Sequence, residues 1–255
     1  MGRGIRRQFR QTICLISLTF IQIDVQNRER CDQDFCAGTI DSGDRTYVCG
    51  DARLGPTLLP SCLPLTSVIE GTSNYSRFGG LCPGEVLSAW TNYASPGQQG
   101  WFFYPYADGF ANNTAGKPIH GRLTLKPGMQ VDRFGGVQGT FLAPAGTPYN
   151  QRALPPANLN PPPGNGTQVP YNYHVYQVNK PVVVIGGPVA SWFGQPGFGT
   201  QFQLPRTVAA LLRDAVLEEI VVEEKCNLLT NSGQEWRWTP IGGASRLANG
   251  ALFEE

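Results

Sequence analysis

Glycine and proline punctuate this chain, with 31 Gly and 21 Pro among 255 residues. Both residue types interrupt regular elements and mark turns. Such a chain is expected to form short strands joined by loops rather than a helical bundle. Hydrophobic residues at 41% and charged residues at 15% describe a folded protein that can bury a substantial core.

The charge of the chain excludes one class of partner. Its formal net charge is +1 at pH 7. A protein that neutralises many phosphates needs a large excess of Lys and Arg, and this chain has 20 Lys and Arg against 19 Asp and Glu. We therefore expect no nucleic-acid partner.

The N-terminus has the pattern of an export signal. Four arginines within the first ten residues precede an apolar run from Thr12 to Ile23. This run has the length of a signal-peptide core and is too short to span a bilayer. We predict a signal peptide over residues 1–25, no transmembrane segment, and a secreted or cell-surface protein. The sequence after Ile23 lacks a small-x-small cleavage pattern, so an unusual processing site or a misassigned start stays open.

The cysteines agree with export. Of the seven, Cys14 lies in the predicted signal, which leaves an even six, and five of these lie in the first third of the chain. Six thiols allow 15 pairings, and the sequence does not choose among them. The chain has no Cys-x-x-Cys pair and no histidine cluster, so we predict disulfides and no metal site. Sequons at Asn74, Asn112 and Asn165 are consistent with a glycosylated, secreted surface.

Hydrophobic periodicity predicts a few regular elements. A helix is expected from Pro83 to Tyr93, because Pro83 suits a first turn, and a second helix is expected after Pro205. The apolar face of the second helix comprises Val208, Leu211, Leu212 and Ala215. Runs of aromatic and β-branched residues predict strands. These strands lie at Gly139–Leu142, Tyr173–Val178, Pro181–Ile185 and Glu219–Glu223.

One long stretch carries most of the motifs. Between Asp132 and Asp214 the chain contains no acidic residue, but it is rich in arginine, aromatic, glutamine and glycine motifs. These groups suit a ligand that is anionic at one end, flat at both ends, and able to react without a strong acid. A site built within this stretch would have to work without carboxylates.

These motifs resemble a known family. Asp132-Arg-Phe-Gly135, the run from Gly139-Thr-Phe-Leu-Ala-Pro to Arg152-Ala-Leu-Pro-Pro156, and Gly197-Phe-Gly-Thr-Gln-Phe202 occur in the order found in the tuberculosis necrotizing toxin domain, an NAD glycohydrolase. The upstream motifs look like those of the secreted or cell-surface NADases of filamentous fungi, in particular Tyr47-Val-Cys-Gly-Asp-Ala-Arg-Leu-Gly-Pro56 and Arg77-Phe-Gly-Gly-Leu-Cys-Pro83. The resemblance to the toxin domain covers residues 126–205.

The resemblance implies both architecture and activity. It implies an α+β fold with a β-sheet core and a few helices, and a disulfide-stapled, thumb-like N-terminal subdomain. We accordingly expect the subdomain at 31–125, the catalytic domain at 126–225 and a C-terminal extension at 226–255. The implied activity is hydrolysis of NAD, with NADP as a second substrate, to nicotinamide and ADP-ribose. A homodimer is also implied.

The chemistry of NAD explains how such a site could dispense with acids. Ordinary glycoside hydrolysis uses two carboxylates because an alkoxide leaves badly. The nicotinamide of NAD already carries a positive charge and departs as a neutral molecule. The protein must only orient the dinucleotide and place water against the developing oxocarbenium ion.

The resemblance suggests roles for individual residues. Arg152 is expected to anchor the pyrophosphate, because guanidinium makes bidentate bonds to phosphate oxygens, although a structural arginine is the alternative. Arg133 is also expected at the substrate site, unless its neighbour Asp132 holds it in a salt bridge. Gln201 is the predicted catalytic residue, because its amide can accept from a ribose hydroxyl and donate to another group at once.

Aromatic residues are candidates for the walls of the site. Phe134 and Phe141 could flank the nicotinamide by stacking and cation-π attraction, and Trp192 is a further candidate. Aromatics in a strand-rich protein are otherwise plain core. His174 stays open between a buried, hydrogen-bonded histidine and a base.

No cofactor is predicted, because NAD is the substrate. Some fungal relatives bind calcium near the C-terminal end, but here the nearby acidic residues lack an alternating oxygen-ligand loop. These residues are Glu218, Glu219, Glu223 and Glu224. Calcium is therefore not carried over.

Two alternative functions stay open. ADP-ribosyl transfer or cyclisation would follow if a group other than water captured the oxocarbenium ion. The chain could instead be a secreted cell-wall or adhesion protein without catalysis.

Overall fold

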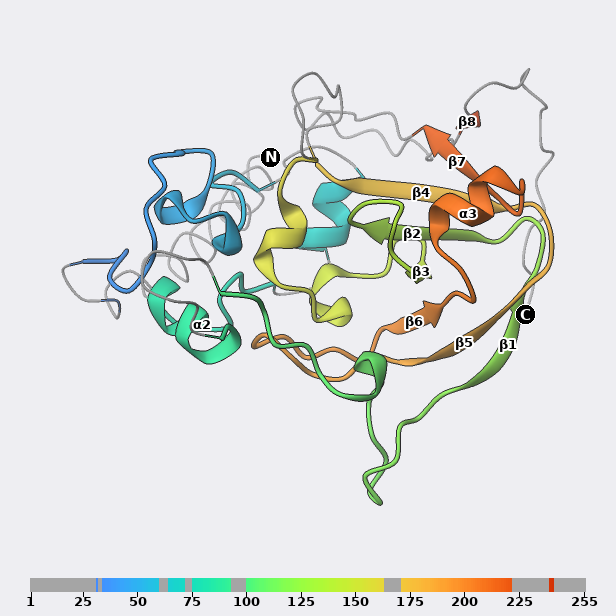
Figure 1. The fold of residues 1–255 in the computed structure, drawn as a ribbon, viewed down its shortest axis with the longest axis horizontal. Helices are drawn as coiled ribbons and strands as arrows, with labels where there is room; N and C mark the ends of the chain where they lie inside the picture. The colour runs from blue at the N-terminus through green and yellow to red at the C-terminus, as the bar shows by residue number, and fades with distance from the viewer. Residues whose placement is uncertain are drawn as a thin grey trace, which may run out of the picture.

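The computed structural model describes residues 31, 34–59, 64–71, 75–92, 100–162, 171–221 and 239–240. Within them, one antiparallel sheet of eight strands has the order β1-β5-β6-β3-β2-β4-β7-β8 (Figure 1). The strands are β1 Gly121–Leu125, β2 Gln130–Phe134, β3 Phe141–Pro144, β4 Tyr173–Val178, β5 Val182–Pro188, β6 Thr200–Gln203, β7 Leu217–Val221 and β8 Thr239–Pro240. The helices are α2 Pro83–Trp90 and α3 Val208–Arg213. The expected α+β fold with a sheet core and few helices is confirmed.

The predicted elements form where the periodicity placed them. β4 has the predicted bounds, and β3, β5 and β7 overlap their predicted ranges. α2 begins at Pro83 as expected, and the Glu85 carboxylate accepts a hydrogen bond from the Cys82 N–H at its start. α3 begins after Thr207 and ends before Ala215, which adopts a left-handed φ of 50° and so leaves the predicted helical face.

The sheet begins earlier in the chain than the predicted domain division at 125/126. β1 pairs with all five of its residues along β5, from Gly121 opposite Gly186 to Leu125 opposite Val182. Four of the five β1 residues are exposed, as suits an edge strand. This exposure removes the alternating hydrophobic pattern by which a strand is recognised in a sequence.

The two faces of the central strands pack into separate cores. Val131 of β2 and Tyr176 of β4 join the core that α3 covers. Phe134 of β2 and Val175 of β4 join a second core with Tyr149. Neighbouring residues in a strand point to opposite faces. Odd-numbered positions of β2 therefore face the first core, and even-numbered positions face the second.

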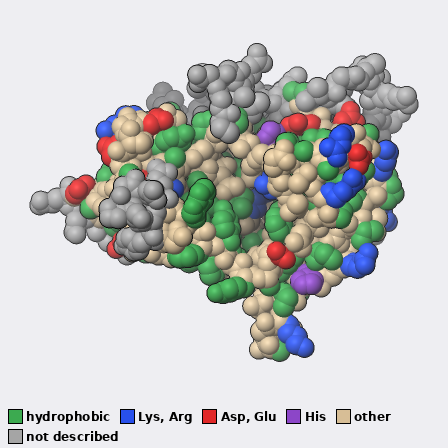
Figure 2. All heavy atoms as spheres, in the orientation of Figure 1, with side chains coloured by type: hydrophobic (Ala, Val, Ile, Leu, Met, Phe, Trp, Pro, Cys, Tyr) green, Lys and Arg blue, Asp and Glu red, His purple; other side chains and the backbone are tan. Residues whose placement is uncertain are grey.

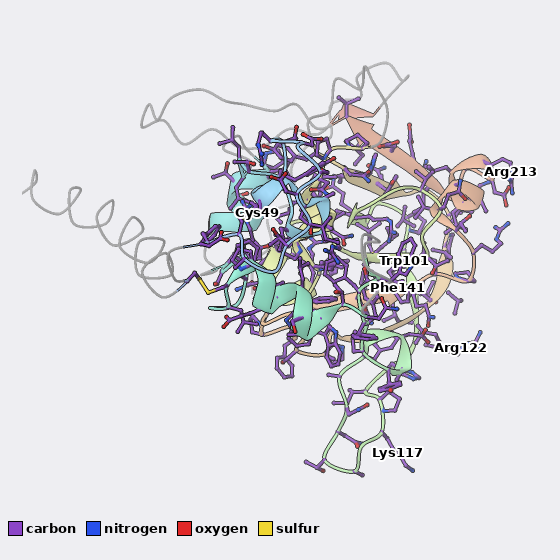
Figure 3. The ribbon with its side chains drawn as sticks, turned by 60° about the vertical axis from the view of Figure 1, so that its left-hand side comes forward. Cys49, Trp101, Lys117, Arg122, Phe141 and Arg213 are labelled. Carbon is purple, nitrogen blue, oxygen red and sulfur yellow. A yellow bond between two sulfur atoms is a disulfide. The ribbon has the colours of Figure 1, made fainter. Side chains whose placement is uncertain are left out.

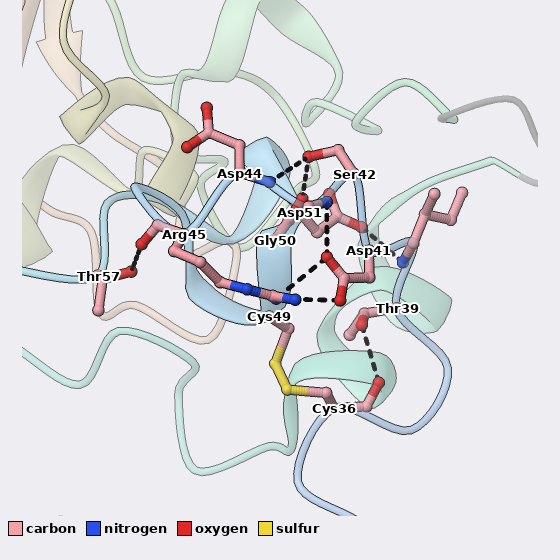
Figure 4. Close-up of polar contacts among 12 residues, drawn as sticks. Cys36, Thr39, Asp41, Ser42, Asp44, Arg45, Cys49, Gly50, Asp51 and Thr57 are labelled. Carbon is pink, nitrogen blue, oxygen red and sulfur yellow. Dashed lines mark hydrogen bonds and ion pairs between the residues drawn. A yellow bond between two sulfur atoms is a disulfide. The ribbon is translucent and has the colours of Figure 1, made fainter.

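The N-terminal region of the chain is held by disulfides and a buried carboxylate. Cys31 is bonded to Cys82 and Cys36 to Cys49. Burial acts to raise the pKa of Asp51, but hydrogen bonds from Arg53 and from the Ile40 N–H outweigh it and hold the pKa below its usual value. Figure 4 shows the Cys36–Cys49 bond and the polar contacts of this region, including those around Asp51. Cys62 and Cys226 lie outside the described residues, as does the predicted signal peptide. Of the predicted C-terminal extension, only Thr239 and Pro240 of β8 are described.

Close contacts join the N-terminal region to the part of the chain that forms the sheet. Figure 1 shows it with α2 on one side of the sheet, opposite β1 and α3. Gln195 is buried and donates from Nε2 to the Ser76 carbonyl at 2.6 Å. At Gly79 a Cβ would lie 2.7 Å from the Cα of Gly194. The two glycines therefore permit these two backbone segments to come into contact. No helix in the described part of the chain is both long and apolar enough to cross a membrane.

Loss of the Cys36–Cys49 disulfide should weaken the fold measurably. The bond closes a loop with a sequence separation of 13. Double substitution to serine is expected to lower the free energy of unfolding by about 3 kcal/mol, because the unfolded chain regains the entropy of that loop. Guanidinium unfolding under non-reducing conditions measures the change, and a variant as stable as the wild type would contradict it.

Candidate functional site

The candidate site is organised around a buried carboxylate on β2. Asp132 is 0% exposed and its oxygens receive four hydrogen bonds. Arg152 donates twice, from Nη1 to Oδ1 at 2.5 Å and from Nη2 to Oδ2 at 2.8 Å. The Tyr173 hydroxyl and the Gly146 N–H each donate to Oδ2 at 2.8 Å. The carboxylate therefore ties β2 to β4 and to the chain that follows β3.

The Arg152 guanidinium makes its hydrogen bonds inside the protein. Its Nε donates to the Thr147 carbonyl at 2.8 Å, and its side chain is 6% exposed. Burial acts to lower the pKa of Arg152, but the Asp132 charge outweighs it and the pKa is raised. The guanidinium carbon lies 5.1 Å from the Phe134 ring centre, and that ring is 2% exposed. Arg152 itself thus supplies the cation on Phe134, where the sequence suggested a ligand ring.

Arg133 leaves β2 on the opposite face from Asp132. Its Nε donates to the Gly136 carbonyl at 2.9 Å and its Nη1 to the Phe141 carbonyl at 2.8 Å. Among the described residues, no carboxylate lies within salt-bridge distance of it, so Asp132 does not hold it. A Cβ at Gly139 would lie 1.9 Å from Arg133 Nη2, so a side chain at this position would displace the guanidinium from its present place. Burial lowers the pKa of Arg133, while the phenol groups of Tyr176 and Tyr104 act in the opposite direction.

Phe141 and Gln201 share one face of the sheet. Phe141 of β3 stands opposite Gln203 of β6, and Gln201 lies two residues further along β6. The intervening Phe202 points into the core on the other face. Gln201 donates from Nε2 to the Asp108 carbonyl at 2.9 Å. Its Oε1 makes no hydrogen bond within the described part of the chain.

A segment from the N-terminal part of the chain crosses this face. We call residues 101–109 the aromatic strap, because four of its aromatic rings are half or more exposed. These rings belong to Trp101, Phe103, Tyr104 and Tyr106. Figure 2 shows hydrophobic side chains gathered around a hollow in the middle of the molecule's face. In Figure 3 the chain after the strap runs out to a projecting hairpin, with Lys117 at its end and Arg122 near its base.

Trp192 is hydrogen-bonded to the strap near the strap's N-terminal end. Its Nε1 donates to the Phe103 carbonyl at 2.7 Å. Its ring lies 5.3 Å from that of Trp90 on α2. The strap therefore connects Trp192 to Gln201 through two of its own carbonyls.

His174 and the C-terminal acids lie apart from this arrangement. His174 Nδ1 lies 2.6 Å from Glu219 Oε1, and Nε2 lies 2.9 Å from Asn172 Oδ1. Both ring nitrogens have partners, as in the structural alternative. Glu218 accepts from Asn179 Nδ2, and Glu223 and Glu224 lie outside the described residues.

The structure thus brings some of the predicted residues together and keeps others apart. Arg133 donates to the Phe141 carbonyl, Phe141 and Gln201 share one face of the sheet, and the strap joins Trp192 to Gln201. Arg152 and Phe134 lie in the core around Asp132. Within the described part of the chain, the first group of residues offers a cation that has no carboxylate partner, an amide oxygen that accepts no hydrogen bond, and flat apolar rings.

Sequence reasoning missed the strap. Asp108 contributes a backbone carbonyl, which no side-chain motif can reveal, and it lies in the part of the chain assigned to the thumb-like subdomain. The Asp108-Gly109 pair signals a turn, but not what the turn contacts.

Comparisons with known proteins agree with the motifs. The family model of the tuberculosis necrotizing toxin matches residues 124–220. The chain is 50% identical over 191 residues to the conidial surface nicotinamide adenine dinucleotide glycohydrolase nadA of Aspergillus fumigatus, covering 75% of this chain and 78% of that protein.

Solved structures also match. Tuberculosis necrotizing toxin, in complex with its immunity factor, is 21% identical with a TM-score of 0.39, covering 73% of this chain and 87% of that one. Rhs1-CT, in complex with its cognate immunity protein, is 21% identical with a TM-score of 0.28, covering 43% of this chain and 82% of that one.

Removing Arg152 should destabilise the protein far more than removing Arg133. Arg152→Met would leave the Asp132 carboxylate buried without its cation, a loss of about 3–5 kcal/mol. Arg133→Met leaves no carboxylate unpaired, and about 1 kcal/mol is expected. Chemical unfolding of both variants measures the difference. Equal losses would contradict the division of tasks between the two arginines.

Proposed function

The chain belongs to the family of the Aspergillus fumigatus conidial surface NAD glycohydrolase, and on that premise we propose that it hydrolyses the nicotinamide-ribosyl bond of NAD. The products are nicotinamide and ADP-ribose. Family membership supports the reaction, and one structural observation carries the choice of site. That observation is the Arg133 guanidinium, which donates to two carbonyls and has no carboxylate within salt-bridge distance among the described residues.

Arg133 is proposed to bind the pyrophosphate. Its carbonyl contacts use Nε and Nη1, so Nη2 and the remaining hydrogens of the fork are available to an anion. Partial burial weakens competition from water and strengthens the attraction. Arg152, the anchor that the sequence suggests, enters the proposal instead as the residue that neutralises Asp132 and thereby holds β2 in place.

Gln201 is proposed to hold the nicotinamide ribose. Its free Oε1 can accept from a ribose hydroxyl beside the bond that breaks. Nicotinamide leaves as a neutral molecule, so the protein needs to stabilise and orient an oxocarbenium ion rather than protonate a leaving group. An arrangement of arginine, amide and aromatic rings is sufficient for that task.

Phe141 and Trp192 are proposed as the flat walls of the site. Phe141 lies on the same face as Gln201 and is partly exposed, so its ring can meet the pyridinium. The Trp192 indole N–H donates to the strap, and its ring lies beside Trp90. We therefore propose that Trp192 forms a wall at the edge of the site. Phe134 supports the site from the core.

Three finer statements accompany the proposal. NADP is a second substrate, the protein is secreted or held at the cell surface as the named relative is, and it forms a homodimer. The first rests on the shared nicotinamide-ribosyl bond, the second on the relative's conidial location and the described disulfides, and the third on family resemblance. No cofactor takes part.

Product analysis tests the reaction. Purified protein incubated with NAD is expected to release nicotinamide and free ADP-ribose in equal amounts, resolved by chromatography. A cyclic product or ADP-ribosylated protein would instead support transfer of the oxocarbenium ion to another group. Unchanged NAD would overturn the proposal.

Substitution of Gln201 tests its role. Gln201→Ala is expected to lower kcat at least about tenfold, because the ribose loses its acceptor while the partly exposed position leaves the fold intact. Steady-state kinetics and a thermal melt of the same sample measure both effects. A folded variant with near-normal turnover would remove Gln201 from the mechanism.

Substitution of Arg133 tests the anion site. Arg133→Met is expected to raise KM for NAD by about tenfold or more, the loss of a charge-assisted contact. KM should become less sensitive to salt than in the wild type, because screening then acts on one fewer charge. An unchanged KM would contradict the assignment.

A further inference from the structure

The orientation of the Gln201 amide is fixed by the aromatic strap. An amide can present either its oxygen or its NH₂ group, and the contacts decide which. Here Nε2 donates to the Asp108 carbonyl at 2.9 Å. A carbonyl oxygen accepts and cannot donate, so the amide oxygen cannot occupy that place. Oε1 is consequently the atom left for a ligand.

The turn that presents this carbonyl has an unusual backbone. Ala107, Asp108 and Gly109 all have left-handed φ, at 53°, 56° and 80°. Non-glycine residues rarely adopt this conformation, and they keep it only where surrounding contacts enforce it.

Two further hydrogen bonds supply such contacts. The Gly109 carbonyl accepts from the Ala190 N–H at 2.8 Å, and the Phe103 carbonyl accepts from Trp192 Nε1. The strap is thus fastened to the sheet domain on both sides of the Asp108 carbonyl.

We propose that the Asp108 backbone carbonyl is a positioning group, which holds the Gln201 amide so that it acts only as a hydrogen-bond acceptor toward the substrate. The inference rests on the proposed function and adds a selectivity to it. The site would favour ligands that present a donor there, such as a ribose hydroxyl. It also gives the N-terminal part of the chain a task in the reaction.

A glutamate at position 201 distinguishes this idea from a simple need for any acceptor. Ionised glutamate keeps acceptor oxygens but has no hydrogen to donate to the Asp108 carbonyl. A carboxylate oxygen would then repel the carbonyl oxygen at the place where the wild type makes a hydrogen bond. Protonated glutamate has one O–H donor and one free carbonyl, as the amide does. The neutral form is therefore the one that fits, and contact with the carbonyl raises the pKa of the new carboxyl.

The charged surroundings of position 201 can be specified. Strands β3, β5 and β6 carry no titratable residue. Titratable or charged groups come from the strap, the chain after it, β1, β2 and the turn before Ala153: Tyr104, Tyr106, Asp108, His120, Arg122, Asp132, Arg133, Tyr149 and Arg152. Because these groups are the same in wild type and variant, the ratio of the two activities isolates the new carboxyl.

The experiment measures kcat and KM for NAD of the full chain, of Gln201→Glu and of a control, from about pH 8 to about pH 5, across which a raised glutamate pKa would titrate. The control is Gln177→Glu, the same change on β4, three strands from β6 in the sheet order. At the high-pH end, kcat of Gln201→Glu is expected at least about tenfold below wild type, with KM much less affected. The ratio to wild type is expected to rise at least about threefold toward low pH as the carboxyl protonates. The Gln177→Glu ratio should stay flat.

Several results would overturn the proposal. A wild-type kcat for Gln201→Glu at the high-pH end would do so. So would a folded Gln201→Glu variant whose kcat is lowered by the same factor at every pH. If instead the wild type released no nicotinamide, the proposed function would fail and the positioning inference would fall with it, which is a different result from an active wild type with a flat ratio.

A second variant covers the case in which Gln201→Glu does not fold. Ala107→Pro is incompatible with φ of 53° and displaces the Asp108 carbonyl, while Ala107 is exposed and outside the cores. It is expected to lower kcat at least about tenfold with little change in the thermal melt. Wild-type kcat in this variant would overturn the proposal.

Discussion

The hydrogen bonds to the Asp132 carboxylate are the interaction on which the rest of the structure depends. An ionised carboxylate taken out of water costs several kcal/mol unless it is paired and fully hydrogen-bonded. Arg152, Tyr173 and Gly146 satisfy it from three separate segments of the chain. Because all three must meet at one carboxylate, β2, β4 and the turn after β3 have a single relative placement.

This placement separates the tasks of two neighbouring charges. Asp132 and Arg133 are adjacent in sequence and therefore point to opposite faces of β2. Asp132 takes Arg152 as its partner, and the contacts that the described residues make with the Arg133 guanidinium are to carbonyls. The Asp132–Arg152 pair thus leaves Arg133 without a carboxylate partner in this part of the chain, and we propose that its guanidinium binds the substrate's phosphates.

Much of the sheet could be predicted from the sequence, because β4, β5 and β7 alternate or run together in apolar residues bounded by turns. β1 could not, since an exposed edge strand carries no such pattern. In the candidate site, motifs were enough to propose Gln201 and Phe141. The pairing of Arg152 with Asp132 could not be predicted, because a motif shows that an arginine is present but not which carboxylate folds against it. The Asp108 carbonyl has no side-chain signature at all, and only the tertiary fold brings it to Gln201.

A crystal structure with a non-hydrolysable NAD analogue tests the central claim most directly. The account predicts phosphate oxygens within hydrogen-bond distance of the Arg133 guanidinium, with the Asp132–Arg152 pair intact beneath. Phosphates bound to Arg152 with that pair broken, or a dinucleotide bound away from Arg133 and Gln201, would contradict it.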